Sequence, residues 1–193
     1  MIKTFETYSS QDLPCILYIN GFRHWLKDDN LDVYGKDDKT MKVLSQFRNK
    51  VLHGSIDWKS SEYQIDEIRR TIDNNNVVGI VGFSAGGYVS FNLSNEYDIP
   101  ALSINPAMAS TSSAPTLQPI KKSSLFPEQI VVIGEEDTKD LKGVDGELVM
   151  NDLEKMKFED MGGEIIIFED TYHLITNEQF DRVFKYFYKK YVR

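Results

Sequence analysis

One serine of the chain has neighbours that could make it a nucleophile. The segment Gly82-Phe83-Ser84-Ala85-Gly86 matches the pattern G-x-S-x-G, in which a serine occupies a sharp turn between a strand and a helix. Residues 77–81 before it are apolar and rich in β-branched side chains, as in a strand buried on both faces of a parallel sheet. Residues 88–97 after it are predicted to form a helix. Strand, turn and helix come in the order that the pattern requires, which favours a nucleophile elbow over an ordinary glycine-rich turn.

A serine hydroxyl needs a base at neutral pH, usually a histidine, and the histidine needs an acceptor that holds its tautomer. The chain has three histidines. His173 lies just past the last predicted strand, and Asp137 lies just past the strand before it. The chain order Ser84, Asp137, His173 is the order expected for an elbow serine. We therefore predict a Ser-His-Asp triad from these three residues.

Other residues compete for the roles of base and acid. His24 follows the first predicted strand and is expected to line the mouth of the site. His53 lies inside an apolar strand segment, which is typical of a core histidine or of one that supports the site. The alternatives to Asp137 as the acid are its neighbours, Glu135, Glu136 and Asp140.

Backbone amides are expected to stabilise the developing oxyanion. One donor in this arrangement is the N–H of the residue after the nucleophile, here Ala85. The second should come from the loop after the first strand, where Phe22 is the candidate because the turn at Gly21 presents its amide. The segment 107–127 is predicted to be an irregular loop, too short for a large helical lid, so we expect an open site. Its predicted lining residues are Gly21, His24, Trp25 and Met108.

Strands and helices alternate along the predicted scaffold. The predicted strands are residues 13–19, 50–55, 77–81, 101–104, 129–134 and 164–168. The predicted helices are residues 40–49, 62–74, 88–97, 147–159 and 177–191. Right-handed crossovers between such strands give a three-layer α/β/α sandwich with a doubly wound, mostly parallel sheet of about six strands. Reactive groups then gather beyond the carboxyl ends of the strands.

Composition restricts the class of protein. The length of 193 residues predicts a single domain covering residues 1–193. A formal net charge of −8 argues against nucleic acid or an anionic membrane as a partner. The first residues lack the apolar core of a signal peptide, so a cytoplasmic location is expected. Cys15 is the only cysteine and is predicted to be a small buried thiol.

With these residues in place, the sequence resembles the α/β-hydrolase superfamily and, within it, the YqiA-type bacterial esterases. The similarity is densest over residues 79–88 and continues through Pro100-Ala101 and residues 104–107. Residues 18–22 resemble the family's His-Gly-Phe segment, with Asn20 in the place of the histidine. Asp137 and His173 match the family's acid and base by their positions after strands. Asp170-Thr171-Tyr172 replaces the glycine that often precedes this histidine.

The resemblance implies a minimal α/β-hydrolase fold without a large lid, and carboxylic ester hydrolysis of small or short-acyl substrates through an acyl-enzyme. It implies no metal and no organic cofactor. Two other interpretations stay open at this point. One is a thioesterase or peptidase on the same scaffold, and the other is a non-catalytic binding protein that keeps the fold.

Overall fold

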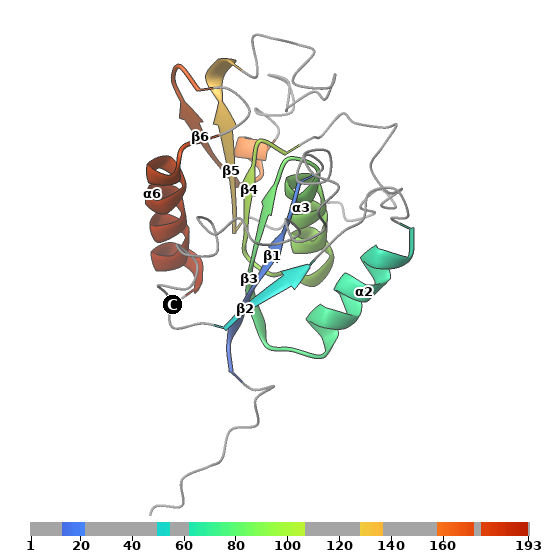
Figure 1. Cartoon of the computed structure of the whole chain (residues 1–193). Coiled ribbons are helices and arrows are strands. Elements are labelled where there is room, and N and C mark those ends of the chain that lie inside the picture. Colours follow the sequence, from blue (N-terminus) through green and yellow to red (C-terminus); the bar gives the residue numbers. More distant parts are fainter. Residues whose placement is uncertain are drawn as a thin grey trace, which may run out of the picture.

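A single parallel sheet forms the centre of the computed structural model, which describes residues 13–21, 50–54, 62–106, 128–136, 158–171 and 175–192 (Figure 1). Within these ranges six strands pair in the order β2-β1-β3-β4-β5-β6, and every neighbouring pair is parallel. The strands are β1 (Cys15–Ile19), β2 (Lys50–Gly54), β3 (Val77–Phe83), β4 (Ala101–Ile104), β5 (Gln129–Gly134) and β6 (Glu164–Phe168). The predicted sheet is thereby confirmed.

Helices cover both faces of the sheet (Figure 1). Helices α2 (Glu62–Asp73) and α3 (Ala85–Tyr97) lie on one face, and α6 (Asn177–Phe187) lies on the other, followed by a π-helical turn, η3 (Tyr188–Val192). Strand β1 shows why both faces need cover. Leu17 and Ile19 pack toward α2 and α3, whereas Ile16 and Tyr18 pack toward α6, so its residues are apolar without alternation. The structure is the predicted three-layer α/β/α sandwich.

The core on the α2 and α3 face follows the predicted helical spacing. Ile65, Ile68 and Ile72 of α2 are buried there together with Val89 and Leu93 of α3. The helical spacing of the isoleucines therefore identified the buried side of α2.

The strand order places a topological switch point beside the predicted nucleophile. From β1 the chain moves to β2 on one side, and it then returns to β3 on the other side of β1. The carboxyl ends of β1 and β3 are therefore neighbours, and ligands of open α/β sheets bind in the crevice at such a point. Asn20 and Gly21 follow β1 here, and Ser84 follows β3.

Several element ends differ from prediction. Helix α3 begins at Ala85, three residues before the predicted start, and the closing helix becomes π-helical at Tyr188 instead of continuing to residue 191. Strand β1 begins at Cys15. The predicted helix 40–49, the loop 107–127 and most of the helix 147–159 lie outside the described residues. The described end of that last helix, Phe158–Asp160, stops before Gly162, as predicted.

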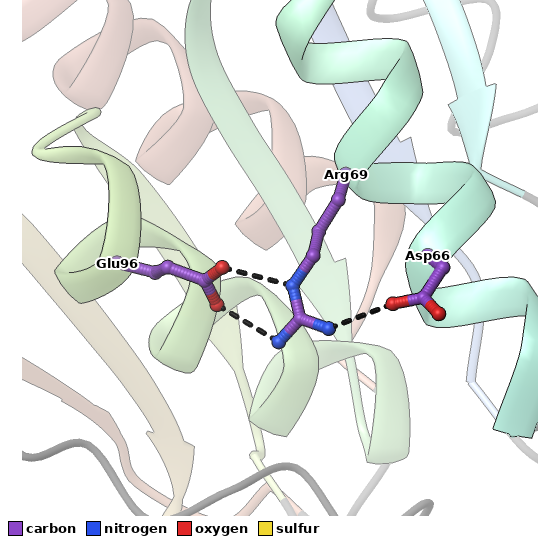
Figure 2. A network of polar contacts seen from close by, with 3 residues as sticks. All are labelled: Asp66, Arg69 and Glu96. Atoms are coloured by element: carbon purple, nitrogen blue, oxygen red, sulfur yellow. Dashed lines mark hydrogen bonds and ion pairs between the residues drawn. The ribbon is translucent and has the colours of Figure 1, made fainter.

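An ion-pair network joins α2 to α3 at the surface (Figure 2). The Arg69 guanidinium donates from Nε to Oε1 of Glu96 at 2.8 Å and from a terminal nitrogen to Oε2 at 3.0 Å. Its other terminal nitrogen reaches Asp66 at 3.0 Å. The hydrogen bond to Glu96 is the main reason that the pKa of Arg69 lies above its ordinary value. The planar fork of an arginine suits such a two-point contact with a carboxylate.

Arg69→Ala should lower the free energy of unfolding by about 0.5–1 kcal/mol, the range for solvent-exposed ion pairs. Urea denaturation of Arg69→Ala, Glu96→Gln and the double variant measures the coupling between the two side chains. The coupling should shrink in roughly 0.5 M NaCl, since salt screens exposed charges. Arg70→Ala, on the same turn of α2, is the matched control. An equal coupling of Arg70 to Glu96 would contradict the assignment.

No helix within the described ranges combines the length and the apolar character needed to cross a membrane.

Candidate active site

Ser84 occupies a strained turn between β3 and α3. Its backbone angles are φ 54° and ψ −122°, a region that residues with a side chain rarely adopt. Two hydrogen bonds hold this conformation. The Ser84 N–H donates to the carbonyl of Ile104 at 2.8 Å, and the Ser84 carbonyl accepts from the N–H of Tyr88 at 3.0 Å. The strain is thus fixed by β4 on one side and by the first turn of α3 on the other.

The two glycines of the pattern are required by close backbone approach. A Cβ at Gly82 would lie 2.2 Å from the carbonyl oxygen of Gly86. A Cβ at Gly86 would lie 2.4 Å from the carbonyl oxygens of both Ile19 and Asn20. All of these neighbours are backbone atoms, which cannot rotate away. The start of α3 therefore rests directly on the ends of β1 and β3.

A pair of buried hydroxyl groups ties α3 to β4 just behind the turn. Ser90 Oγ donates to the carbonyl of Gly87 at 2.8 Å, and it lies 2.8 Å from Ser103 Oγ. Since Ser90 has one hydroxyl proton, Ser103 is the donor in the second contact. The helix that follows Ser84, α3, is thus hydrogen-bonded to the neighbouring strand β4.

Gly21 and Ala85 lie against Ser84. A Cβ at Gly21 would be 3.0 Å from Cβ of Ser84 and 2.8 Å from the carbonyl oxygen of Phe83, so the chain after β1 touches the turn. Ala85 is the first residue of α3, and the first N–H groups of a helix have no acceptor within the helix. The structure therefore brings together Ser84, one predicted oxyanion donor and the turn that leads to the other, Phe22.

Asn105 connects the end of β4 to the end of β5. Its N–H donates to the carbonyl of Val132 at 2.7 Å, and its side-chain Oδ1 accepts from the N–H of Gly134 at 2.7 Å. Asn105 is fully buried and has φ 41°, a left-handed conformation that asparagine tolerates better than most residues. One side chain thus fixes where the chain leaves β5, directly before Glu135, Glu136 and Asp137.

The chain segments after β5 and β6 are hydrogen-bonded to each other. The N–H of Glu136 donates to the carbonyl of Thr171 at 3.0 Å. Asp170, just before Thr171, has φ 50°, the left-handed conformation that glycine adopts most easily. An aspartate therefore makes this turn although the glycine often found before the histidine is absent.

Only part of the predicted site lies within the described residues. Ser84, Ala85 and Gly21 are described and lie together, and Glu135 and Glu136 follow β5 as expected. His53 is half-buried on β2, where its ring packs edge-on against Tyr18 with centroids 5.5 Å apart. The predicted residues outside the described ranges are Phe22, His24, Trp25, Met108, Asp137, Asp140 and His173. Among the described side chains, no three His, Cys, Asp or Glu residues gather as a metal site would require.

With this geometry known, comparison with known proteins gives a family. Residues 36–166, more than half of the chain, match the uncharacterised protein family UPF0227. The chain belongs to this family. The matched segment contains Ser84 and Asp137, and it confirms the predicted YqiA-type resemblance. No curated protein sequence matches the chain.

Solved structures with the same fold include several hydrolases. SOBER1 from Arabidopsis thaliana superimposes with a TM-score of 0.54 at 15% identity, over 91% of this chain and 98% of that one. The esterase Pf2001 from Pyrococcus furiosus gives 0.57 at 15% identity, with 94% and 85% covered. Est1E from Butyrivibrio proteoclasticus, with ferulic acid bound, gives 0.60 at 12% identity, with 94% and 90% covered. At such identities the likeness establishes the fold, which is the α/β-hydrolase fold.

Sequence reasoning missed two residues that organise this edge of the sheet. Asn105 was identified only as the end of a strand, and Gln179 of α6 was not singled out. For Gln179 a signal existed, because Thr176-x-x-Gln179 before an apolar stretch is the pattern of a capping box. For Asn105 the signal was weaker: an asparagine at the end of a buried strand is a common left-handed residue.

Gly86→Ala should destabilise the protein by at least about 2 kcal/mol, because the new methyl group would overlap two backbone carbonyls. Helix propensity alone predicts the opposite sign, a gain of up to about 1 kcal/mol. Gly54→Ala is the matched control, since its nearest neighbours would lie at 3.4 Å, ordinary contact. Urea denaturation compares the two. A Gly86→Ala variant as stable as wild type would refute the close packing of α3 on β1.

Asn105→Gly should cost about 1–3 kcal/mol of stability, since the buried N–H of Gly134 loses its acceptor. Asn105→Ala loses the same acceptor and must also hold φ 41° with a Cβ, which adds about 1–2 kcal/mol. Thermal and urea unfolding of both variants test this order. Equal stability of the two would show that backbone strain at Asn105 is unimportant.

Proposed function

We propose that the chain is a serine hydrolase that cleaves carboxylic esters with small or short acyl groups. Ser84 Oγ attacks the ester carbonyl carbon while the His173 imidazole takes its proton, and Asp137 orients that imidazole. The tetrahedral intermediate expels the alcohol, which receives the proton from His173. Water, activated by the same imidazole, then releases the carboxylic acid from the acyl-enzyme. The chemistry needs neither a metal nor an organic cofactor.

The observation that carries this proposal is the backbone of Ser84. A serine held at φ 54° by two hydrogen bonds and by the flanking glycines stores strain that a plain surface turn does not need. It stands at the switch point of the sheet, where ligands of this architecture bind. Its side chain makes no capping hydrogen bond to α3, although serine is a preferred capping residue. These features support a nucleophile more strongly than a structural serine.

The contact between Gly21 and Ser84 supports the proposed oxyanion hole. The N–H of Ala85 stands at the positive end of the α3 dipole, where a developing negative charge is stabilised. Phe22, the second proposed donor, is the next residue in the chain after Gly21. Removing one such donor typically costs about 10²- to 10³-fold in rate. Catalysis would therefore depend on backbone held by β1 and α3.

The bond between Glu136 and Thr171 supports the proposed acid and base. Asp137 is the residue after Glu136, and His173 is two residues after Thr171. The two segments that carry them thus start from hydrogen-bonded neighbours at the carboxyl ends of β5 and β6. Solved proteins of the same fold that are named as esterases support an ester as the substrate class.

Wild-type protein should react with a fluorophosphonate probe and hydrolyse short p-nitrophenyl esters. Ser84→Ala should lose labelling, and both Ser84→Ala and His173→Ala should lower kcat by at least about 10³-fold, as in other triads. His53→Ala is the control histidine variant and should retain most activity. Lack of labelling of the wild type, or equal labelling of Ser84→Ala, would exclude a serine hydrolase. A parallel series of acyl-thioesters and peptide anilides ranks the substrate classes.

A further inference from the structure

Gln179 makes hydrogen bonds to both described ends of the segment that carries His173. Its Nε2 donates to Thr171 Oγ1 at 2.9 Å, and its Oε1 accepts from the N–H of Thr176 at 2.7 Å. Residues 172–175, which include His173, lie between these two partners in the chain. A single carboxamide therefore bridges the point where the chain leaves β6 and the point where it enters α6.

The direction of each bond follows from the groups involved. The backbone N–H of Thr176 can only donate, so the oxygen of the Gln179 carboxamide must face it and the NH₂ group must face Thr171. Thr171 Oγ1 donates its one proton to the carbonyl of Glu169 at 3.0 Å, so it accepts from Gln179. Thr171 is buried, which makes these bonds costly to lose. The orientation of Gln179 is thus fully determined.

Helix capping alone does not account for this arrangement. A capping box needs only the Oε1 of the residue at this position, and a glutamate would supply it equally well. Here Thr176 Oγ1 also accepts from the N–H of Gln179 at 3.2 Å, so the box is complete without Nε2. The bond from Nε2 to Thr171 is additional to the capping box, and an ionised glutamate at this position could not donate it.

The same network extends to the acidic segment. The carbonyl of Thr171 accepts from the N–H of Glu136, the residue before Asp137. Gln179 therefore holds Thr171 through its side chain, and Thr171 holds the acidic segment through its backbone.

We infer that Gln179 is a positioning residue for the proposed base: its carboxamide clamps Thr171 to Thr176, described residues on either side of His173. This inference rests on the proposed function. Loosening the clamp lets the imidazole depart from the orientation that the reaction needs, and a misplacement of about 1 Å can cost up to about 10²-fold in rate. Substrate binding, which does not use His173, is retained.

Three variants of the full chain separate positioning from capping. Gln179→Met keeps the length of the side chain and removes both bonds. Gln179→Glu keeps the acceptor for Thr176 and loses the donor to Thr171. Thr176→Ala is the matched control, since it removes the other half of the capping box and leaves both carboxamide bonds available. Thermal unfolding establishes that each variant is folded.

With p-nitrophenyl butyrate, kcat of Gln179→Met and Gln179→Glu should fall about 10- to 100-fold, with KM within about twofold of wild type. Thr176→Ala should keep kcat within about twofold although it costs about 1 kcal/mol of stability. Unchanged kcat in a folded Gln179→Met protein would overturn the inference. So would a loss of kcat in Thr176→Ala as large as that in Gln179→Glu, because helix capping would then explain both.

A measurement that does not depend on activity tests the clamp independently of the proposed function. In protein labelled with ¹⁵N-histidine, the His173 signals are assigned by their loss in His173→Ala. In Gln179→Met the His173 ¹⁵N chemical shifts should change, because the clamp beside this residue is lost, while the signals of His53 stay unchanged. Identical His173 chemical shifts in wild type and Gln179→Met would overturn the clamp even in an active enzyme. An inactive wild type in which His173 still responds to Gln179 would refute the hydrolase and uphold the clamp.

Discussion

The close approach of the first turn of α3 to the ends of β1 and β3 is the constraint on which the rest of this edge depends. Carbonyl groups of Ile19 and Asn20 lie where a Cβ of Gly86 would be, so the helix can begin here only because glycine stands at that position. A Cβ at Gly82 or at Gly21 would likewise overlap a backbone carbonyl oxygen, that of Gly86 or of Phe83. Because Gly21, Gly82 and Gly86 have no side chain, Ser84 fits at the place where β1, β3 and α3 meet. The unfavourable backbone of Ser84 is sustained by this packing and by the bond to Ile104.

The remaining strand ends are joined by hydrogen bonds between backbone groups, between side chains, and between side chains and backbone. Asn105 links β4 to β5, Glu136 and Thr171 link the segments after β5 and β6, and Gln179 links that last segment to α6. Each bond lies at or beyond a carboxyl end, where the sheet's own ladder has stopped. These bonds therefore hold the residues that directly follow β4, β5 and β6, beyond the hydrogen bonds of the sheet itself. Two of the polar residues involved, Asn105 and Thr171, are buried, which raises the cost of breaking their bonds.

Sequence patterns predicted the sheet well because each strand is a short apolar run, and strands buried on both faces need no alternation to be recognised. They predicted the turn between β3 and α3 because a glycine pattern follows a strand directly at Ser84. They missed the true start of α3, since Gly86 and Gly87 are poor helix formers and only tertiary contact explains helix there. The π-helical end at Tyr188 has no local signal of this kind. Asn105 and Gln179 act through partners distant in sequence, such as Gly134 and Thr171, and pairings of this sort cannot be read from spacing alone.

The two faces of the sheet draw on very different spans of the chain. The main described cluster under α2 and α3 is composed of residues between Cys15 and Ala101, and a smaller one joins Phe91 of α3 to Val131, Ile133 and Phe158. The core under α6 combines Ile16 and Tyr18 with residues as late as Val192. On a ribosome that adds about 5–20 residues per second, about 5–20 s pass between the synthesis of Leu102 and that of Val192. During that time α6, the described helix that packs on this face, has not yet been synthesised. Within the described residues, the contacts made by α6 are therefore the last part of the core to form.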